Sequence, residues 1–270
     1  MRCKVCESPT EHFGRLKILQ AFDARYLRCT RCGFVFVEQP TWLEQAYELP
    51  IAAADTGIVV RNLRFADVVG ALIDLALPDA RQCIDFGGGA GLFVRLMRDR
   101  GYEFYRQDKY CDNVFAVGFD ASPEQRFDLA TSIEVIEHIV EPMSVLQQLA
   151  QLAPTLLIGT EQLPAERNRP GEWWYYAPEG GQHVSFFSAR ALQVAAERLG
   201  LQLASNGRNV HVFSRERISP ALVRMIGRRR GLAVARAWIK LTRRPRRSLT
   251  HSDAAAARAN GPSAEGRTGS

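Results

Sequence analysis

The chain has 270 residues, of which 46% are hydrophobic and 24% are charged, so it is long enough to form one substantial domain with a core of ordinary size. No apolar run approaches the roughly 20 residues that a membrane-spanning helix needs, and the first residues lack the apolar core of a signal peptide. We therefore expect a cytoplasmic protein in which the six cysteines are reduced.

The net charge of +6 is concentrated near the C-terminus. Residues 215–247 hold twelve Arg and Lys side chains and one acid, Glu216, so the rest of the chain carries a net charge of −5 (+6 minus +11). The main part of the chain therefore lacks the basic surface that is typical of a nucleic-acid-binding protein, and we expect no nucleic-acid partner.

Four cysteines form two matched pairs near the N-terminus, Cys3-x-x-Cys6 and Cys29-x-x-Cys32. Each pair can supply two thiolates from one tight turn, and four thiolates suit tetrahedral zinc. We therefore predict that residues 1–38 form a zinc ribbon, with short strands over 16–22 and 34–37 and a small core that depends on the metal. The modest charge of this segment favours a structural or substrate-lid role over RNA binding.

Residues 39–79 are interpreted as a linker or lid followed by a first helix. Apolar residues recur at intervals of three and four between Ile58 and Leu77, which predicts a helix that ends before Pro78.

A glycine-rich stretch begins the main domain, which we place at residues 80–214. An apolar run ends at Asp85, and Gly87, Gly89 and Gly91 follow before a helical pattern begins. Glycines can adopt positive φ and let a ligand lie against the backbone, and the helix N-terminus presents free N–H groups. The stretch predicts a nucleotide-like ligand at a strand–helix junction.

Two motifs resemble those of the class I S-adenosylmethionine-dependent methyltransferases. The pattern Asp-x-Gly-x-Gly-x-Gly over 85–91 resembles their first motif, and Glu-Val-Ile-Glu-His over 134–138, after a strand predicted at 127–133, resembles their fourth. The resemblance implies an α/β fold with a doubly wound, mostly parallel, Rossmann-like sheet of seven strands. It also implies S-adenosylmethionine as the cofactor.

The resemblance further assigns cofactor-binding residues. The second predicted strand ends near Asp108, which would bind the ribose hydroxyls, with Asp112 as the alternative. A third strand predicted at 114–119 ends at Asp120, which would lie near the adenine. The predicted cofactor-binding residues are Asp85, Gly87, Gly89, Gly91, Asp108 and Asp120.

The 134–138 segment lies, in this family, where cofactor and acceptor meet. Glu134, Glu137 and His138 share one face of a turn entering a helix, where they can bind a divalent ion such as Mg²⁺, Mn²⁺ or Zn²⁺. The segment is similar to the metal-binding segment of small-RNA 2′-O-methyltransferases and to one in ubiquinone-pathway O-methyltransferases, and those families add a later histidine, in a place that His183 matches. Alternatively no metal binds. In that case His138, with Glu137 or His183, orients or deprotonates the acceptor, or the segment is only structural.

A long insertion precedes His183 and contains four consecutive aromatic residues, which we predict to line an acceptor pocket unless they form a surface patch. These residues are Trp173, Trp174, Tyr175 and Tyr176. The run His-Val-Ser-Phe-Phe-Ser over 183–188 resembles bacterial methyltransferases associated with sugar and cell-surface glycan pathways. We therefore predict methyl transfer to a hydroxyl of a small-molecule or sugar acceptor. The alternatives are an RNA methyltransferase that contacts RNA through the ribbon, and a cofactor-binding protein without catalytic activity.

The domain is predicted to end in a hairpin of two strands, at 201–205 and 210–214, joined by an Asn-Gly turn. Residues 215–247 mix apolar and basic side chains and predict an amphipathic segment. Through 219–247 this segment can contact the inner face of an anionic membrane, or it packs on the core as a solvated helix. Residues 248–270 are predicted to be disordered.

Overall fold

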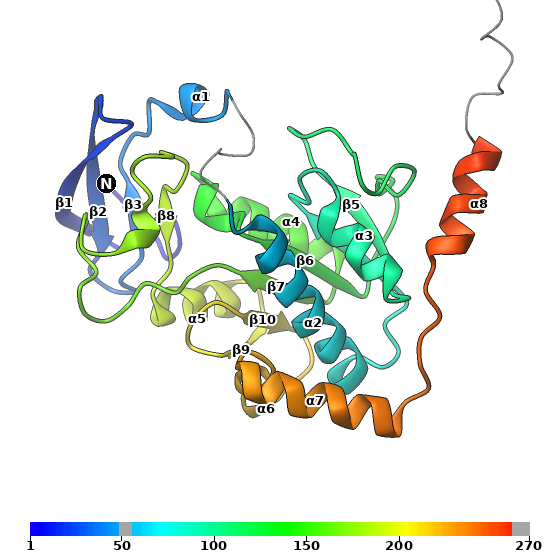
Figure 1. Cartoon of the computed structure of the whole chain (residues 1–270). Coiled ribbons are helices and arrows are strands. Elements are labelled where there is room, and N and C mark those ends of the chain that lie inside the picture. The colour runs from blue at the N-terminus through cyan, green and yellow to red at the C-terminus, as the bar shows by residue number, and fades with distance from the viewer. Residues whose placement is uncertain (49–55, 261–270) are drawn as a thin grey trace, which may run out of the picture.

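Apolar runs after residue 80 form the strands of a six-stranded sheet in the computed structural model, which describes residues 1–48 and 56–260 (Figure 1). The strand order is β5-β4-β6-β7-β10-β9, and all strands run parallel except β10, which is antiparallel to both of its neighbours. The strands are β4 (Gln82–Phe86), β5 (Glu103–Gln107), β6 (Leu129–Ile133), β7 (Thr155–Gly159), β9 (Gln202–Ser205) and β10 (His211–Ser214). This confirms the predicted doubly wound, mostly parallel sheet and its closing hairpin.

Helices cover both faces of this sheet and bury separate apolar clusters against it. One face carries α2 and α3, whose buried side chains include Phe65, Val69 and Met97. The other carries α4 and α5, which bury Leu146, Leu192 and their neighbours. The helices are α2 (Ile58–Ala76), α3 (Leu92–Asp99), α4 (Pro142–Leu152) and α5 (Ala189–Arg198). The first of these ends at Ala76, as the prediction from Pro78 required.

The predicted third strand at 114–119 does not form, so the described sheet has six strands rather than seven. The Asn113 side chain accepts the Ala116 N–H at 3.0 Å and donates to the Ala116 carbonyl at 2.7 Å, which closes a turn instead. Gly118 then turns the chain with φ of 86°. Only a single parallel bridge between Arg106 and Asp120 remains at this edge of the sheet.

The N-terminal segment forms a second, four-stranded sheet in the order β1-β2-β3-β8. Its strands are β1 (Thr10–Ile18), β2 (Phe22–Cys29), β3 (Val35–Val37) and β8 (Ser185–Phe186). The last strand comes from the main domain, so the boundary predicted at residue 38 does not separate two independent sheets. Cys29, Cys32 and Phe34 pack in the same apolar cluster as α4 and α5.

A short helix, α1 (Leu43–Ala46), follows the ribbon within the predicted lid. The Trp42 indole N–H donates to the Gly181 carbonyl at 2.7 Å, and the Gln182 amide donates to the Ala46 carbonyl at 2.8 Å. The lid is thereby tied to the segment that leads into β8. Its continuation at residues 49–55 lies outside the described residues.

The basic segment forms α6 (Pro220–Ile226) and α7 (Arg229–Thr242), which lie together below α2 in Figure 1. In α7, Leu232 and Ala235 are buried against α2, whereas Val234, Trp238 and Leu241 are exposed. Along residues 1–48 and 56–260, no helix combines the length and apolar character required to cross a membrane.

The prediction of disorder from residue 248 is wrong for residues 250–260, which form α8 (Thr250–Asn260). The carboxylate of Asp253 lies buried between Arg95 and Arg98 of α3, and this contact holds the helix. Figure 1 shows α8 at the end of the molecule opposite the ribbon. Residues 261–270 lie outside the described residues.

Candidate functional site

The glycine turn connects β4 to α3, as predicted. Gly87, Gly89 and Gly91 all have positive φ, a backbone conformation that residues other than glycine rarely adopt. No described atom lies within 4 Å of a Cβ placed on Gly89, so the backbone there can be approached closely. At Gly87, by contrast, a Cβ would lie 2.6 Å from a methyl group of Val135. A ligand can therefore approach the backbone of the turn at Gly89. At Gly87 the turn instead packs directly against the 134–138 segment.

Asp108 follows β5 and its carboxylate is fixed beside the glycine turn. Its Oδ2 accepts the Gly89 N–H at 2.9 Å, and its Oδ1 accepts the N–H groups of Tyr110 and Cys111 at 2.8 Å. Each oxygen keeps further acceptor capacity. Asp108 thus lies beside the glycine turn, and Asp112 is exposed; the ribose-binding role of either acid stays a prediction.

Arg106 was not predicted from the sequence, although it holds this part of the site together. Its Nε donates to the Gly89 carbonyl at 2.6 Å, its Nη1 donates to Asp120 Oδ1 at 2.7 Å, and its Nη2 donates to the Cys111 carbonyl. The residue is buried on β5, where it follows Phe104 in the alternation of the strand. The sequence feature that could have indicated this role is a basic residue at an inward-facing position of the strand that ends beside the glycine turn.

Asp120 is exposed but also takes part in contacts within the protein. Besides its ion pair with Arg106, its Oδ2 accepts the Asn113 amide at 2.9 Å. Because Asn113 also packs against Gly91, the segment after Asp108 lies on the glycine turn. The prediction that Asp120 meets the adenine stays a prediction.

Asp85 is buried at the end of β4 and braces the sheet. Its Oδ1 accepts the Thr131 hydroxyl of β6 at 2.7 Å, and Oδ2 lies under Gly88. Burial raises the pKa of Asp85 to about 7, because charging a carboxyl away from water is costly. In the structure Asp85 therefore packs beneath the glycine turn and links it to β6.

The 134–138 segment begins at the end of β6 and places two carboxyl groups around one phenol. Glu134 has φ of 55°, and its N–H donates to the Gly159 carbonyl at 2.7 Å. The Tyr175 hydroxyl donates to Glu137 Oε1 and lies 3.3 Å from Glu134 Oε2. Burial, and then the neighbouring Glu137, raise the pKa of Glu134 to about 8, while burial raises the pKa of Glu137. Oε2 of Glu137 is buried without a hydrogen-bond partner among the described residues.

Two histidines complete this cluster. His183 Nδ1 lies 2.6 Å from the Tyr175 carbonyl, which can only accept, so Nδ1 carries a proton and Nε2 is the ring nitrogen that can act as an acceptor or ligand. His138 Nδ1 lies 3.0 Å from the Tyr47 hydroxyl, and burial holds the pKa of His138 well below its usual value. The two rings are 4.8 Å apart and nearly perpendicular.

The structure gathers three of the four predicted divalent-metal ligands. One ligand atom from each of Glu137, His138 and His183 lies within 4.8 Å of the other two, whereas Glu134 is not part of this group. A neutral imidazole lone pair and a carboxylate oxygen without a partner suit either a divalent ion or a proton acceptor.

The four N-terminal cysteines also converge. The Sγ atoms of Cys6 and Cys29 are 3.4 Å apart, and those of Cys3 and Cys32 are 3.7 Å apart. Backbone N–H groups point at the sulfurs, as from Val5 to Cys3 at 3.4 Å. Four thiols at this spacing fit the tetrahedral zinc site that the sequence predicts.

The aromatic run does not form a pocket wall as a unit. Tyr176 packs in the core of the ribbon and donates to the Asn168 carbonyl at 2.6 Å, and Trp173 packs against it. Trp174 is 70% exposed, and only Tyr175 reaches the carboxyl groups. The ring of Tyr176 is buried against Tyr26 of β2, and the acceptor-pocket role of the aromatic run stays a prediction.

A different aromatic residue, Tyr47, contacts the cluster from the lid. Its ring is stacked near Tyr110 at 6.3 Å, and its hydroxyl reaches His138. The sequence placed Tyr47 in a lid without indicating its contact, because that contact joins segments 91 positions apart.

Comparison with known proteins identifies a family for most of the main domain. Residues 61–206 match the profile of a family described as a methyltransferase domain. No curated protein sequence is similar enough to the chain to count as a match.

Solved structures show a distant likeness. TnmH is 20% identical with a TM-score of 0.47, and the match covers 66% of this chain and 62% of that one. Magnesium protoporphyrin IX methyltransferase from Synechocystis PCC 6803, with bound SAH, is 16% identical with a TM-score of 0.44, over 64% and 92% of the two chains. The mitomycin 7-O-methyltransferase MmcR is 14% identical with a TM-score of 0.44, over 64% and 60%.

Proposed function

Because this chain belongs to the class I S-adenosylmethionine-dependent methyltransferases, we propose that it methylates a hydroxyl oxygen of a small-molecule acceptor such as a sugar or glycan. The observation that carries the proposal is the contact of Val135 with Gly87. This contact brings the cluster of buried Glu137 and partly buried His138 and His183 next to the cofactor turn.

S-adenosylmethionine supplies an electrophilic methyl group, so the protein has to bind, orient and deprotonate the acceptor. The backbone at Gly87, Gly89 and Gly91 receives the cofactor, and Asp108 accepts hydrogen bonds from its ribose. Nε2 of His183 accepts the proton of the acceptor hydroxyl, since Nδ1 is committed to the Tyr175 carbonyl. His138, held by Tyr47, orients the same hydroxyl.

The assignment of His183 as the base is tested with His183→Asn in the full chain. Loss of a positioned base should lower methyl transfer about a hundredfold, while the affinity for S-adenosylhomocysteine changes less than about threefold. Transfer is followed with labelled cofactor and cell extract, and the labelled product is identified. His12→Asn, on the exposed face of β1, is the control. Transfer at the wild-type rate in His183→Asn would remove the base role, and no product with wild type would favour the non-catalytic alternative.

A divalent ion such as Mg²⁺ or Mn²⁺ at Glu137, His138 and His183 is the second use that we propose for the same side chains. The buried Oε2 of Glu137, which has no described partner, favours it. Elemental analysis of wild type beside Glu137→Gln tests this use. Equal metal content in the two proteins, beyond zinc bound by the cysteines, would dispose of it.

We further propose that Cys3, Cys6, Cys29 and Cys32 hold one structural Zn²⁺. Cys29→Ser should lose this zinc, whereas Cys83→Ser, at a buried cysteine outside the cluster, should retain it. Zinc per chain is measured by mass spectrometry. Retention of the full zinc content by Cys29→Ser would exclude the site.

The RNA methyltransferase alternative is tested by binding. Affinity for RNA that falls steeply with salt, and is lost when residues 1–38 are deleted, would favour it over a small-molecule acceptor.

Peripheral membrane contact through 219–247 is supported by the exposed stripe of Val234, Trp238 and Leu241 on the basic helix α7. Trp238→Ser should reduce pelleting with anionic liposomes, whereas Trp174→Ser, at another exposed tryptophan, should not. Equal recovery of all three proteins would contradict membrane contact.

A further inference from the structure

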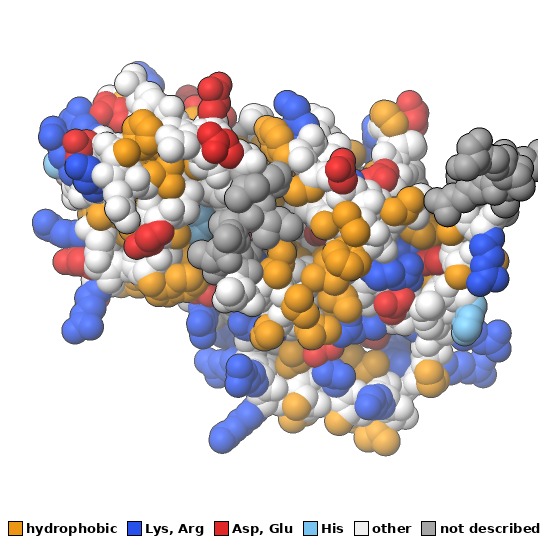
Figure 2. Space-filling model, turned by 45° about the horizontal axis from the view of Figure 1, so that its top comes forward, with side chains coloured by type: hydrophobic (Ala, Val, Ile, Leu, Met, Phe, Trp, Pro, Cys, Tyr) orange, Lys and Arg blue, Asp and Glu red, His pale blue; other side chains and the backbone are white. Residues whose placement is uncertain are grey.

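A pocket of about 260 Å³ lies between α2 and the junction of α6 and α7, apart from the cluster around Tyr175. Lys and Arg side chains gather along the lower part of the molecule in Figure 2, where these two helices lie. The residues that line the pocket are Val60, Arg64, Asp67, Ile226, Gly227, Arg228, Arg229, Leu232, Ala233 and Arg236.

More basic than acidic side chains line the pocket. Arg236 donates to Asp67 Oδ2 at 2.7 Å, and Asp67 also receives Arg100 at 3.3 Å. The pocket's single acid is therefore already shared by two arginines. Arg228 and Arg229 pair with no carboxylate of the described chain. Arg228 and Arg229 are thus left without a carboxylate partner among the described residues, and Arg64 lines the same pocket.

Arg64 is partly buried on α2, so its positive charge is less well solvated than that of an exposed arginine. Its Nη2 donates to the Gly227 carbonyl at 3.2 Å and to Asn209 Oδ1 at 3.4 Å, which are neutral acceptors. Burial, followed by the nearby Arg208, lowers the pKa of Arg64, and Arg229 acts in the same direction, whereas Glu161 and Glu134 partly oppose this shift. A bound anion would offset this repulsion.

The start of α7 adds to the attraction for an anion. Its first turn, from Arg229, has free backbone N–H groups, and the helix is 14 residues long. A side chain at Gly231 would overlap the Met225 carbonyl of α6, so glycine at this position lets the two helices meet closely. The junction therefore holds Arg228 and Arg229 at the mouth of the pocket.

We propose that this pocket binds a phosphate-type oxyanion, either the diphosphate of a soluble compound or the phosphate of a lipid headgroup. Guanidinium groups match phosphate oxygens through paired N–H donors, which favours phosphate here. The apolar side of the pocket, with Val60 and Leu232, leaves room for the organic part of such a ligand. The proposal does not depend on methyl transfer.

Calorimetric titration of the full chain with inorganic pyrophosphate, and separately with monomeric dihexanoyl phosphatidic acid, tests the proposal. The variant is Arg228→Gln/Arg229→Gln, at two exposed side chains whose replacement leaves the core intact. The control is Arg190→Gln, an exposed arginine of α5 that forms an ion pair with Glu197. Binding of S-adenosylhomocysteine is measured in all three proteins, because it reports the state of the rest of the fold.

Wild type and the control should bind at least one of the two probes, and the double variant should bind it about tenfold to a hundredfold more weakly, as expected for lost charge-assisted hydrogen bonds. A lipid affinity at least about tenfold above that of pyrophosphate assigns the site to a headgroup, and any lower ratio assigns it to a soluble compound. Absence of binding by either probe, or equal affinity in the double variant and wild type, would overturn the proposal. Neither result bears on methyl transfer, which has its own readout.

Discussion

Asp85 shows how one buried side chain can support a ligand-binding turn at a cost in stability. Its carboxyl is 3% exposed and has one hydroxyl donor, Thr131, so its charged form lacks the solvation that water would provide. The pKa of about 7 in the folded chain lies above the usual value of an unfolded aspartate. The folded state therefore keeps a proton that the unfolded state releases.

This difference predicts a pH dependence of stability. The contribution of Asp85 is fully present below the unfolded pKa, declines above it, and is lost once the pH has risen through about 7. The free energy of unfolding of Asp85→Asn, relative to wild type, should therefore increase by about 2 kcal/mol between pH 5 and pH 8. Urea unfolding of both proteins at the two pH values measures the difference. A difference that does not change with pH would show that Asp85 is ionised in the folded chain at pH 5.

Arg106 leads to a prediction about the cofactor turn. Its three donors join the Gly89 carbonyl, Asp120 and the Cys111 carbonyl, so its removal frees the turn and the segment that packs on it. Arg106→Gln should weaken binding of S-adenosylhomocysteine about tenfold or more, through loss of charge-assisted hydrogen bonds. Arg190→Gln on α5 is the matched control in calorimetric titration. An unchanged affinity in Arg106→Gln would mean that the glycines hold the turn without it.

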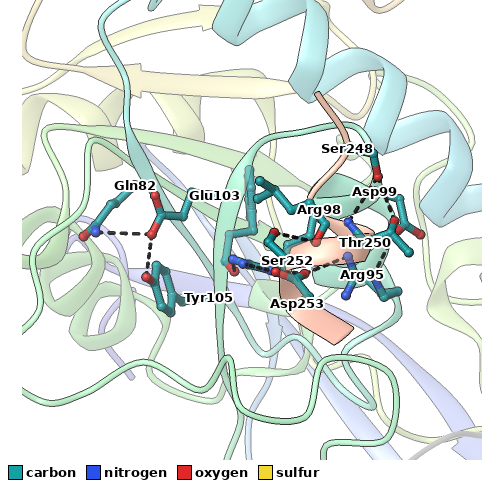
Figure 3. Close-up of polar contacts among 12 residues, drawn as sticks. Gln82, Arg95, Arg98, Asp99, Glu103, Tyr105, Ser248, Thr250, Ser252 and Asp253 are labelled. Carbon is teal, nitrogen blue, oxygen red and sulfur yellow. Dashed lines mark hydrogen bonds and ion pairs between the residues drawn. The ribbon is translucent and has the colours of Figure 1, made fainter. Parts of the chain in front are cut away.

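At the scale of secondary structure, α8 is held to α3 mainly by one buried carboxylate, that of Asp253, which pairs with Arg95 and Arg98. Figure 3 shows Arg95, Arg98 and Asp253 pointing toward one another, with Thr250 near Asp99. Arg98 makes two parallel hydrogen bonds to Asp253, at 2.7 and 2.8 Å, and donates to the Phe104 carbonyl at 3.1 Å. Its guanidinium also lies 3.5 Å from the centre of the Phe119 ring.

Removal of the acid should cost more than a surface pair, because it leaves the guanidinium of Arg98 buried and unpaired. We expect Asp253→Ala to lower the free energy of unfolding by about 3 kcal/mol. Glu197→Ala, which breaks the exposed pair with Arg190, should change it by less than about 1 kcal/mol. Chemical denaturation with a single transition measures both. A loss under 1 kcal/mol in Asp253→Ala would show that α8 contributes little to folding.

Helix α8 is an example of an element that the sequence could not predict. Strands and helices with their own pattern, such as α2 and the hairpin of β9 and β10, were predicted within about two residues. Residues 250–260 are rich in alanine and polar side chains and have no apolar face, so their helix depends on a contact with α3 that no local pattern reports. The failure of the third strand has a comparable cause, since the side chain of Asn113 closes a turn.

In the candidate site, too, some features could be predicted from the sequence and others could not. Glycine spacing and the 134–138 motif predicted the backbone turn and the carboxyl and imidazole groups beside it. The contacts of Arg106, Tyr47 and the Tyr175 hydroxyl join segments far apart in the chain, and periodicity carries no information about them.

At the scale of the whole molecule, the ribbon is part of the candidate site. The Val37 N–H donates to the Val184 carbonyl, and the Val184 N–H donates to the Glu137 carbonyl. The Ser188 hydroxyl, at the start of α5, donates to the Cys32 carbonyl at 2.6 Å. The segment from His183 to Ser188 therefore joins the carboxyl cluster at one end to a cysteine turn at the other.

This arrangement predicts how zinc removal acts. In Cys29→Ser, amide exchange at residues 184–187 should become faster and methyl transfer should fall, while S-adenosylhomocysteine still binds within about fivefold, because the glycine turn lies on a different sheet. Hydrogen-exchange mass spectrometry and calorimetry measure the two effects, with Cys83→Ser as the control. Unchanged exchange at 184–187 would show that the ribbon does not need the proposed zinc to fold.

The pairing of β3 with β8 also affects the order in which the chain can fold during synthesis. Val35 and Phe186 are neighbours in the same sheet, yet most of the main domain is translated between them. Until Phe186 emerges from the ribosome, β3 has an open edge and the apolar side of the ribbon lacks α5. A nascent chain that stalls before this point exposes an unpaired strand, which is the kind of segment that chaperones bind. The four-stranded sheet of the N-terminal ribbon can therefore be completed only after residues 185–186 have been made.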